Sequence, residues 1–222
     1  MDKGSVQGNL FSQGNLFGQK LSDPEVILST TSMADFKREF LARGCVKCDL
    51  HESCTQIVIS RGNPQSRIMI IGEGPGAEED QQGKPFCGKS GQLMDRLFQE
   101  IGFNTDRDTY VTNVVKCRPP ENRTPNKKEV ESCKPYLLKE IEFVKPKVIL
   151  CMGMTSAKHL VRLDSQTKMG EIAGKFFQPP EFPGVTFMIL YHPAALLYTP
   201  SLTKPMKEHL RALKKFLETT AL

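Results

Sequence analysis

The sequence predicts an α/β protein: a single-domain α/β/α sandwich built on a central four-stranded parallel sheet. Short apolar runs that qualify as buried strands alternate with longer stretches in which apolar residues recur at helical spacing. The chain of 222 residues is long enough for one such domain and an additional segment. Strands that are separated by helices favour a parallel sheet with helices on both faces.

Four apolar runs are the predicted strands. They cover residues 67–71, 109–115, 148–152 and 186–190. Ligands of such sheets bind outside the carboxyl ends of the strands, where the connecting loops meet. We therefore expect the functional site in the loops of residues 72–88, 113–123 and 191–203.

Five helices are expected beside these strands. Ser32, Ser90 and Thr124 are the expected N-caps of three of them, because a Ser or Thr side chain accepts a hydrogen bond from a free backbone N–H of the first turn. The expected helices cover residues 33–43, 90–101, 124–144, 155–161 and 206–217.

The first 30 residues differ in composition from the rest of the chain. They are rich in Gly, Gln, Asn and Ser, and the segment Gln7–Phe11 (QGNLF) recurs as Gln13–Phe17. Such a composition cannot bury enough apolar surface to fold. We predict a disordered N-terminal tail over residues 1–30 and a folded domain over residues 31–222.

Charge and composition exclude several classes of protein. A net charge of +5 allows an anionic partner such as nucleic acid but does not indicate one by itself. No apolar run approaches the roughly 18 residues of a membrane span, and the first residues do not resemble a signal peptide. Seven cysteines, an odd number, argue against a disulfide framework. We expect a cytoplasmic monomer that binds no membrane.

A glycine-rich loop follows the first predicted strand. Residues 72–77 (GEGPGA) match the pattern of a dinucleotide-binding loop. Pro75 lacks one of the amide donors that a pyrophosphate needs, and the nearby acidic residues would repel it. The loop is better interpreted as holding one carboxylate, that of Glu73, as a general base or a stabiliser of positive charge.

The cysteines allow a metal site. Cys45 and Cys48 have the spacing of a metal-binding knuckle, and Cys117 and Cys133 would complete four thiolates. Four sulfurs do not distinguish zinc from an iron–sulfur cluster, and buried structural thiols are an equal alternative. The remaining cysteines compete for the same role: Cys54, Cys87 and Cys151.

Three further side chains lie where the predicted strands end or loops begin. His192 precedes Pro193 directly after the last strand, and it is the histidine best placed for chemistry. Asn113 is a polar residue near the end of the second strand, and Phe86 lies in the loop of residues 84–89. A turn partner and a core ring are the structural alternatives for the last two.

Together these motifs resemble the uracil-DNA glycosylase superfamily, and within it the family-4 type, which carries a [4Fe-4S] cluster. The resemblance extends over about residues 32–222. The segments that carry it are 72–80, 83–86, 113–120, 122–125 and 192–193.

This resemblance implies a DNA repair enzyme that flips uracil out of DNA and hydrolyses its N-glycosidic bond, which leaves an abasic site. It places the uracil pocket at Glu73, Gly74 and Pro75, with Phe86 stacking on the base. It also implies the following: Asn113 reads the base edge, His192 lies near O2, and the cluster ligands are Cys45, Cys48, Cys117 and Cys133.

The sequence departs from the family pattern at Cys87 and at Ala194-Ala195, and it also lacks the aspartate of another branch of the superfamily. The aspartate that positions water in the better-known branch falls on Gly74, so we expect Glu73 or Glu79 to do this work. Cys87 replaces a usual aliphatic residue, and Ala194-Ala195 follows His-Pro in place of the common serine. An iron–sulfur electron-transfer or sensor protein without glycosylase activity is the alternative function.

Contacts with DNA are expected from basic and apolar residues near the pocket loops. Lys89, Lys116, Arg118 and Arg123 suit phosphates, and residues 196–198 (LLY) either wedge the duplex open or belong to a core helix. The two tail repeats resemble the Gln-x-x-Leu-Phe peptides that dock on the bacterial sliding clamp, which makes this clamp a second candidate partner.

Overall fold

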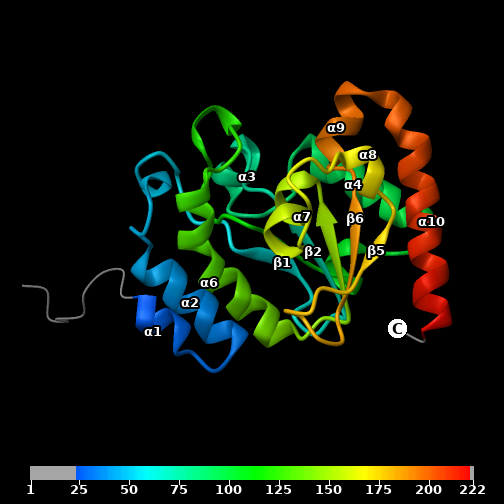
Figure 1. Cartoon of the computed structure of the whole chain (residues 1–222). Coiled ribbons are helices and arrows are strands. Elements are labelled where there is room, and N and C mark those ends of the chain that lie inside the picture. The colour runs from blue at the N-terminus through cyan, green and yellow to red at the C-terminus, as the bar shows by residue number, and fades with distance from the viewer. Residues whose placement is uncertain (1–23, 221–222) are drawn as a thin grey trace, which may run out of the picture.

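The computed structural model describes residues 24–220, and in this range the chain forms a six-stranded mixed sheet flanked by helices (Figure 1). The strand order is β1-β3-β2-β4-β6-β5. The strands are β1 Ser60–Gly62, β2 Ile68–Gly72, β3 Tyr110–Asn113, β4 Val148–Met152, β5 Phe176–Phe177 and β6 Thr186–Leu190.

The four predicted strands are present as β2, β3, β4 and β6, and they pair in parallel. The prediction of a purely four-stranded parallel sheet was nevertheless wrong, because β1 and β5 add an antiparallel strand at each edge. These edge strands have three and two residues. A segment this short cannot show the periodicity by which a strand is recognised in a sequence.

Ten α-helices and three 3-10 helices complete the described part of the chain. The α-helices are α1 Pro24–Leu28, α2 Met33–Arg43, α3 Ala77–Gln82, α4 Lys89–Glu100, α5 Thr105–Asp108, α6 Lys127–Val144, α7 Met154–Leu160, α8 Met169–Ile172, α9 Pro193–Tyr198 and α10 Thr203–Thr219. The 3-10 helices are η1 Asp49–Glu52, η2 Pro120–Asn122 and η3 Pro200–Leu202.

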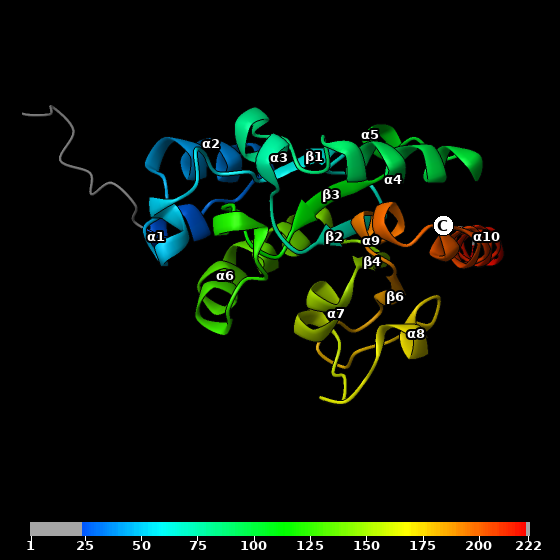
Figure 2. The ribbon, with the colours of Figure 1, turned by 90° about the horizontal axis from the view of Figure 1, so that it is seen from above.

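Helices cover both faces of the sheet. Figure 2 shows α6 and α7 on one side and α4 and α10 on the other. Alternate residues of β2 enter the two cores: Met69 and Ile71 pack with residues of α2 and α6, whereas Ile68 and Ile70 pack with residues of α4 and α10. All five residues of β2 are buried, as expected for a central parallel strand.

Of the three predicted N-caps, one was correct and two were wrong. Ser32 caps α2, since its hydroxyl accepts from the backbone N–H of Asp35. The N-cap of α4 is Gly88, not Ser90. The N-cap of α6 is Asn126, not Thr124: its side chain accepts from Glu129 N, and the Glu129 carboxylate accepts from Asn126 N. This reciprocal capping box satisfies two backbone donors, whereas a hydroxyl satisfies one.

Part of the segment that the sequence predicts to be disordered forms a helix. Helix α1 lies inside the segment 1–30 that was expected to be disordered, and its Ile27 is fully buried in the core. Figure 1 shows α1 next to α2. The repeats Gln7–Phe11 and Gln13–Phe17 lie outside the described residues. Within residues 24–220, no helix has the length and apolar character needed to cross a membrane.

Candidate active site

A cavity of about 580 Å³ opens at the carboxyl ends of β2, β3, β4 and β6. Figure 1 shows α3 and α9, which follow β2 and β6, at this end of the sheet. The structure brings all the predicted pocket residues together in its lining: Glu73, Gly74, Pro75, Glu79, Phe86, Asn113 and His192.

Glu73 follows the last residue of β2 and is fixed at both its backbone and its side chain. Its carbonyl oxygen accepts from Val115 N at 3.1 Å, which continues the β2–β3 pairing past the end of both strands. Its Oε2 atom accepts a short hydrogen bond from the hydroxyl of Thr155, at the start of α7. Among the described residues no group donates to Oε1. Glu73 is therefore a held carboxylate with one oxygen free for a ligand or water.

Glu79 is a buried carboxylate whose two oxygens are both used by the protein. Oε2 accepts from Gly76 N at 3.1 Å, and Oε1 accepts from Gly88 N at 2.8 Å. The backbone of both glycines lies close to this side chain. A Cβ atom at Gly76 would be 2.7 Å from Oε2, and one at Gly88 would be 3.1 Å from Oε1. Glu79 thus joins the glycine-rich loop to the first turn of α4.

Phe86 is buried, and it has a positive φ of 54°, a conformation that L residues other than Gly rarely adopt. Two glycines make room for it. A Cβ atom at Gly91 would lie 1.9 Å from the Phe86 carbonyl oxygen, and one at Gly72 would lie 2.5 Å from the ring atom Cζ. The ring lies 5.7 Å from that of His192, centroid to centroid, with an interplanar angle of 33°. The aromatic face is thus set beside the imidazole at the cavity.

Asn113 ends β3 and is only 2% exposed. Its Oδ1 atom is buried and has no hydrogen-bond partner in the described structure. A buried acceptor without a donor costs about 1–3 kcal/mol, so such a group calls for an explanation. Because Asn113 lines the cavity, a ligand with an N–H donor would satisfy it.

His192 is the N-cap of α9, and its Nδ1 atom accepts from the backbone N–H of Ala194 at 3.2 Å. Burial lowers the pKa of this imidazole to about 4, although the Glu79 charge acts in the opposite direction. The ring is therefore neutral near pH 7. With Nδ1 occupied as an acceptor, the proton of the neutral ring is at Nε2, which makes Nε2–H a donor.

Thr155 and Gly153, which follow β4, also line the cavity but were not predicted from the sequence. Thr155 orients Glu73 through its hydroxyl. Gly153 has a φ of 94° and lies close to His192: a Cβ atom at Gly153 would be 3.2 Å from the Cβ atom of His192. The available signal was topological: β4 was predicted, and its carboxyl end must face the same edge as those of its parallel neighbours.

Lys116 does not lie at the surface, where the sequence analysis expected it to contact DNA. It is fully buried and donates to the Glu140 carboxylate, to Thr112 Oγ1 at 2.6 Å and to the Asn113 carbonyl oxygen at 2.8 Å. Glu140 is fully buried too, and it also accepts from Tyr110. Lys116 therefore neutralises a carboxylate inside the protein and braces the strand end that carries Asn113.

Other basic residues remain near the cavity mouth. Lys89 is exposed at the start of α4, and Arg118 donates to Asn122 Oδ1 at 2.8 Å. Arg123 lines the cavity and forms a two-pronged pair with the buried Glu129. The apolar residues after His-Pro divide between the two alternatives: Leu196 is 3% exposed and belongs to the core, whereas Tyr198 is 87% exposed.

Four cysteines gather where α2 and its following loop approach α6 and the segment after β3. Cys48, Cys117 and Cys133 are buried, and Cys45 is half-buried. Burial raises the pKa values of Cys48 and Cys133, and the hydrogen bond with Cys54 together with burial raises that of Cys117; the nearby Cys45 adds to the shift of all three. The Lys116 backbone N–H donates to Cys133 Sγ at 3.4 Å.

Of the other cysteines, Cys151 lies apart from this group, whereas Cys54 contacts one of its members. Cys151 is fully buried in β4, where burial raises its pKa to about 12. Cys54 lies beside Cys117, which lowers the pKa of Cys54 through a side-chain hydrogen bond. Within residues 24–220, no three His, Cys, Asp or Glu side chains are arranged to hold a single metal ion.

A mostly parallel sheet with a cavity at its carboxyl edge is the setting in which the chain can be compared with known families. The chain belongs to the uracil DNA glycosylase superfamily, whose family model matches residues 59–217. This finding confirms the resemblance drawn from the motifs.

The relatives point to one type within this superfamily. The chain is 44% identical over 166 residues to the type-4 uracil-DNA glycosylase of Pyrobaculum aerophilum, covering 73% of this chain and 84% of the relative. Identity to the type-4 enzyme of Archaeoglobus fulgidus is 40% over 174 residues, 77% and 86% of the two chains. For that of Saccharolobus solfataricus it is 39% over 181 residues, 80% and 83%.

Proposed function

We propose that the protein is a DNA repair glycosylase that flips uracil out of DNA and hydrolyses its N-glycosidic bond, leaving an abasic site. The single observation that carries this proposal is the buried, unpartnered Oδ1 of Asn113 in a cavity that also holds Phe86 and His192. Membership of the superfamily supports the same activity. An iron–sulfur carrier or sensor would need none of these three side chains in such a cavity.

Recognition of the base follows from the donors and acceptors at the cavity. The aromatic ring of Phe86 stacks on the extruded base, an interaction worth about 1–3 kcal/mol per base. Asn113 Oδ1 accepts from N3–H of uracil while its amide group donates to O4. Cytosine presents the inverse pattern and leaves both groups unsatisfied, which is the strongest form of discrimination available to a buried polar site.

The chemistry requires stabilisation of charge on both sides of the breaking bond. The departing uracil carries negative charge on O2, toward which the Nε2–H of neutral His192 donates as in an oxyanion hole. The sugar becomes oxocarbenium-like, and the Glu73 carboxylate offsets its positive charge and orients the attacking water. Thr155 fixes Oε2 of Glu73, which leaves Oε1 for this task.

Glu79 takes a different role in this proposal from the one the sequence suggested. Both of its oxygens already accept from backbone amides, which makes them weaker acceptors for water than Oε1 of Glu73, to which no described group donates. We assign the water-positioning role to Glu73 and a positioning role for the loops to Glu79. On the DNA side, Lys89, Arg118 and Arg123 contact phosphates, and exposed Leu197 and Tyr198 act on the opened duplex.

One assay tests this function directly. A labelled oligonucleotide that contains a single uracil is incubated with the protein, and alkali then cleaves any abasic site. Strand cleavage only at the uracil, and only after alkali, supports a glycosylase without lyase activity. An intact strand at high enzyme concentration would contradict the proposed function.

Replacing Asn113 by Asp should weaken uracil excision and admit some excision of cytosine. The Asp carboxylate can accept from the cytosine N4 amine but cannot donate to O4 of uracil. Single-turnover rates on matched uracil and cytosine oligonucleotides measure the change in discrimination. Unchanged uracil kinetics would remove Asn113 from the base-binding site.

We also propose that Cys45, Cys48, Cys117 and Cys133 hold a [4Fe-4S] cluster. The donor set is four thiols without oxygen or imidazole, which suits iron–sulfur chemistry, and three of the thiols are buried. In such a cluster each thiolate binds its own iron, so the four sulfurs need not surround one ion. None of the four lines the cavity, and the cluster takes no part in the hydrolysis. It joins the loop after α2 to the loop after β3 and to α6.

The cluster proposal makes a prediction about colour. Protein purified without oxygen should be brown, with broad absorbance in the violet and blue. Cys133→Ala should bleach and destabilise it, whereas Cys151→Ala should keep the colour because Cys151 lies in β4, away from the four ligands. A colourless protein that contains stoichiometric zinc would overturn the iron–sulfur assignment. A reducing cytoplasm is the compartment that suits such thiols.

Finally, we propose that the repeats Gln7–Phe11 and Gln13–Phe17 dock on a sliding clamp. Adjacent Leu and Phe fill an apolar pocket in this mode of peptide binding. Alanine at Leu10, Phe11, Leu16 and Phe17 should abolish clamp binding in calorimetry and leave excision from short oligonucleotides unaltered. No binding of the unchanged protein to the clamp of its own organism at high micromolar concentration would refute this idea.

A further inference from the structure

We propose that Arg61 is a positioning residue that holds Phe86 in its base-stacking conformation by gripping the carbonyl oxygen of the preceding residue, Pro85. This inference rests on the proposed function, because it assigns Phe86 to the uracil pocket. Arg61 does not line the cavity and lies on β1, the short edge strand that the sequence did not predict.

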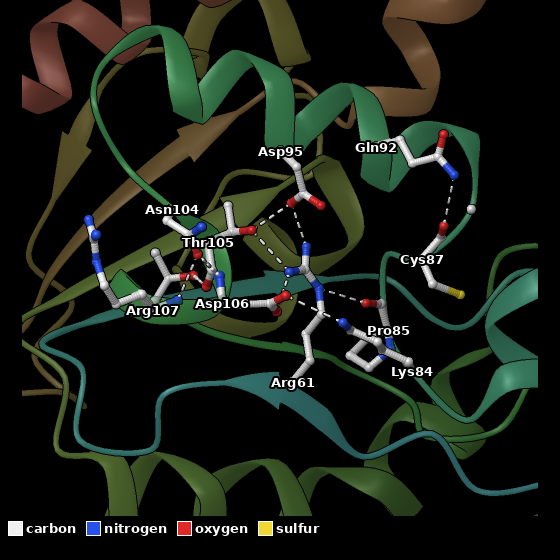
Figure 3. Close-up of polar contacts among 12 residues, drawn as sticks. Arg61, Lys84, Pro85, Cys87, Gln92, Asp95, Asn104, Thr105, Asp106 and Arg107 are labelled. Carbon is white, nitrogen blue, oxygen red and sulfur yellow. Dashed lines mark hydrogen bonds and ion pairs between the residues drawn. The ribbon is translucent and has the colours of Figure 1, made fainter.

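The Arg61 guanidinium makes contacts in three directions (Figure 3). Its Nε atom donates to the Pro85 carbonyl oxygen at 3.0 Å. One terminal nitrogen donates to Asp106 at 2.6 Å and to Thr105 at 3.0 Å, and the other donates to Asp95 at 2.6 Å. Thr105 also donates to Asp95 at 2.6 Å. The guanidinium plane is therefore fixed by α4 and α5, and the Nε–H is directed at the loop.

Solvent exposure argues against a role for Arg61 at the DNA surface. Its side chain is 4% exposed, whereas those of Asp95 and Asp106 are 42% and 53% exposed. A guanidinium this buried cannot reach a phosphate. Two carboxylates neutralise its charge and fix its orientation. In that orientation its Nε–H donates to the Pro85 carbonyl oxygen and so also holds the loop before Phe86.

The loop needs such a grip because Phe86 is strained. A non-glycine residue with a φ of 54° persists only where the surrounding structure over-determines it. Arg61 fixes the loop before Phe86, and Glu79 fixes it after Phe86 through Gly88 N. One buried cation and one buried carboxylate thus brace the two ends of the turn that presents the aromatic ring.

A double-mutant cycle tests whether Arg61 acts through Phe86. Phe86→Ala should lower the single-turnover rate of uracil excision by about five- to 100-fold, the range for loss of base stacking. Arg61→Met should lower it by roughly ten- to 100-fold, since small misplacement of a binding group has effects of this size. In the Phe86→Ala background, Arg61→Met should change the rate by less than about twofold.

Matched variants separate positioning from general destabilisation. Arg107→Met changes an exposed arginine beside the same network that pairs with Asp108, and it should leave the rate and the melting temperature unchanged. In the double variant Arg61→Met/Glu73→Gln, the two reductions in rate should multiply. Glu73 is held by Thr155 and not by the turn that carries Phe86, so the two changes act independently. If Arg61→Met does not fold, Arg61→Lys, which keeps the charge without the fork, serves in the same cycle.

The outcomes distinguish failure of the proposed glycosylase function from failure of the positioning role of Arg61. No excision by the unchanged protein, or a normal rate for Phe86→Ala, would contradict the proposed function or the stacking role. Suppose that Phe86→Ala clearly lowers the excision rate, and that Arg61→Met lowers it by the same factor with and without the Phe86 ring. This result would overturn the positioning role of Arg61 but not the proposed function. A normal rate for Arg61→Met would do the same.

Discussion

Replacing His192 by Ala should lower the single-turnover rate of uracil excision by about 10²–10³, the effect of removing one donor from an oxyanion hole. The structure supplies the reason. The imidazole lies beside the Phe86 ring, and its Nδ1 is occupied by the Ala194 amide, so its Nε2–H is the donor available to the base. Affinity for uracil-containing DNA should change little, because the interaction strengthens as charge develops on O2.

The pH dependence of the rate provides a second measurement on His192. Its pKa of about 4 means that the ring keeps the same protonation state between pH 6 and pH 8. The rate should therefore show no limb from this group in that range. A variant that loses affinity for DNA but retains the chemical rate, or a histidine limb near pH 6.5, would contradict the neutral-donor role.

Replacing Lys116 by Met should destabilise the protein by about 3–5 kcal/mol, the cost of leaving one member of a buried ion pair alone. The Glu140 carboxylate would remain fully buried with only hydroxyl donors, those of Tyr110 and Thr112. The Asn113 carbonyl oxygen would also lose its donor. Denaturant unfolding measures the loss.

Lys128→Met is the control for this measurement. Lys128 lies on α6, as Glu140 does, but its pair with Asp49 is more than 70% exposed on both sides, at 3.7 Å. Exposed pairs contribute about 0–1 kcal/mol, so this variant should unfold almost like the unchanged protein. Equal effects of the two substitutions would show that the Lys116–Glu140 pair is no more important than a surface contact.

The sequence was sufficient for the parallel core and for the location of the site. β2, β4 and β6 consist largely of apolar runs, and polar residues at or just after the ends of the central strands line the cavity. Glu73, Asn113 and His192 illustrate this, because each follows or ends a strand of a parallel sheet and must face the same edge.

Features that depend on contacts between residues distant in the sequence could not be predicted from the sequence. Lys116 looked like a surface cation because nothing in the sequence places Glu140 against it. The sequence also offered no sign that both oxygens of Glu79 accept from backbone amides. Edge strand β1 has three residues, too few for a period, yet it carries Arg61. The N-cap of α6 was misassigned because Thr124 and Asn126 are both good caps, and only Asn126 has Glu129 three residues later.

The order of the strands also bears on how the site comes into existence during synthesis. The cavity takes its residues from the ends of β2, β3, β4 and β6, and β6 is the last strand of the chain to be made. A ribosome-bound chain that stops before His192 contains Phe86 and Asn113 but lacks the part of the cavity lining that follows β6. Contacts between segments so distant in sequence form slowly, after the local helices. The cavity lining is therefore complete only when nearly the whole described domain has emerged.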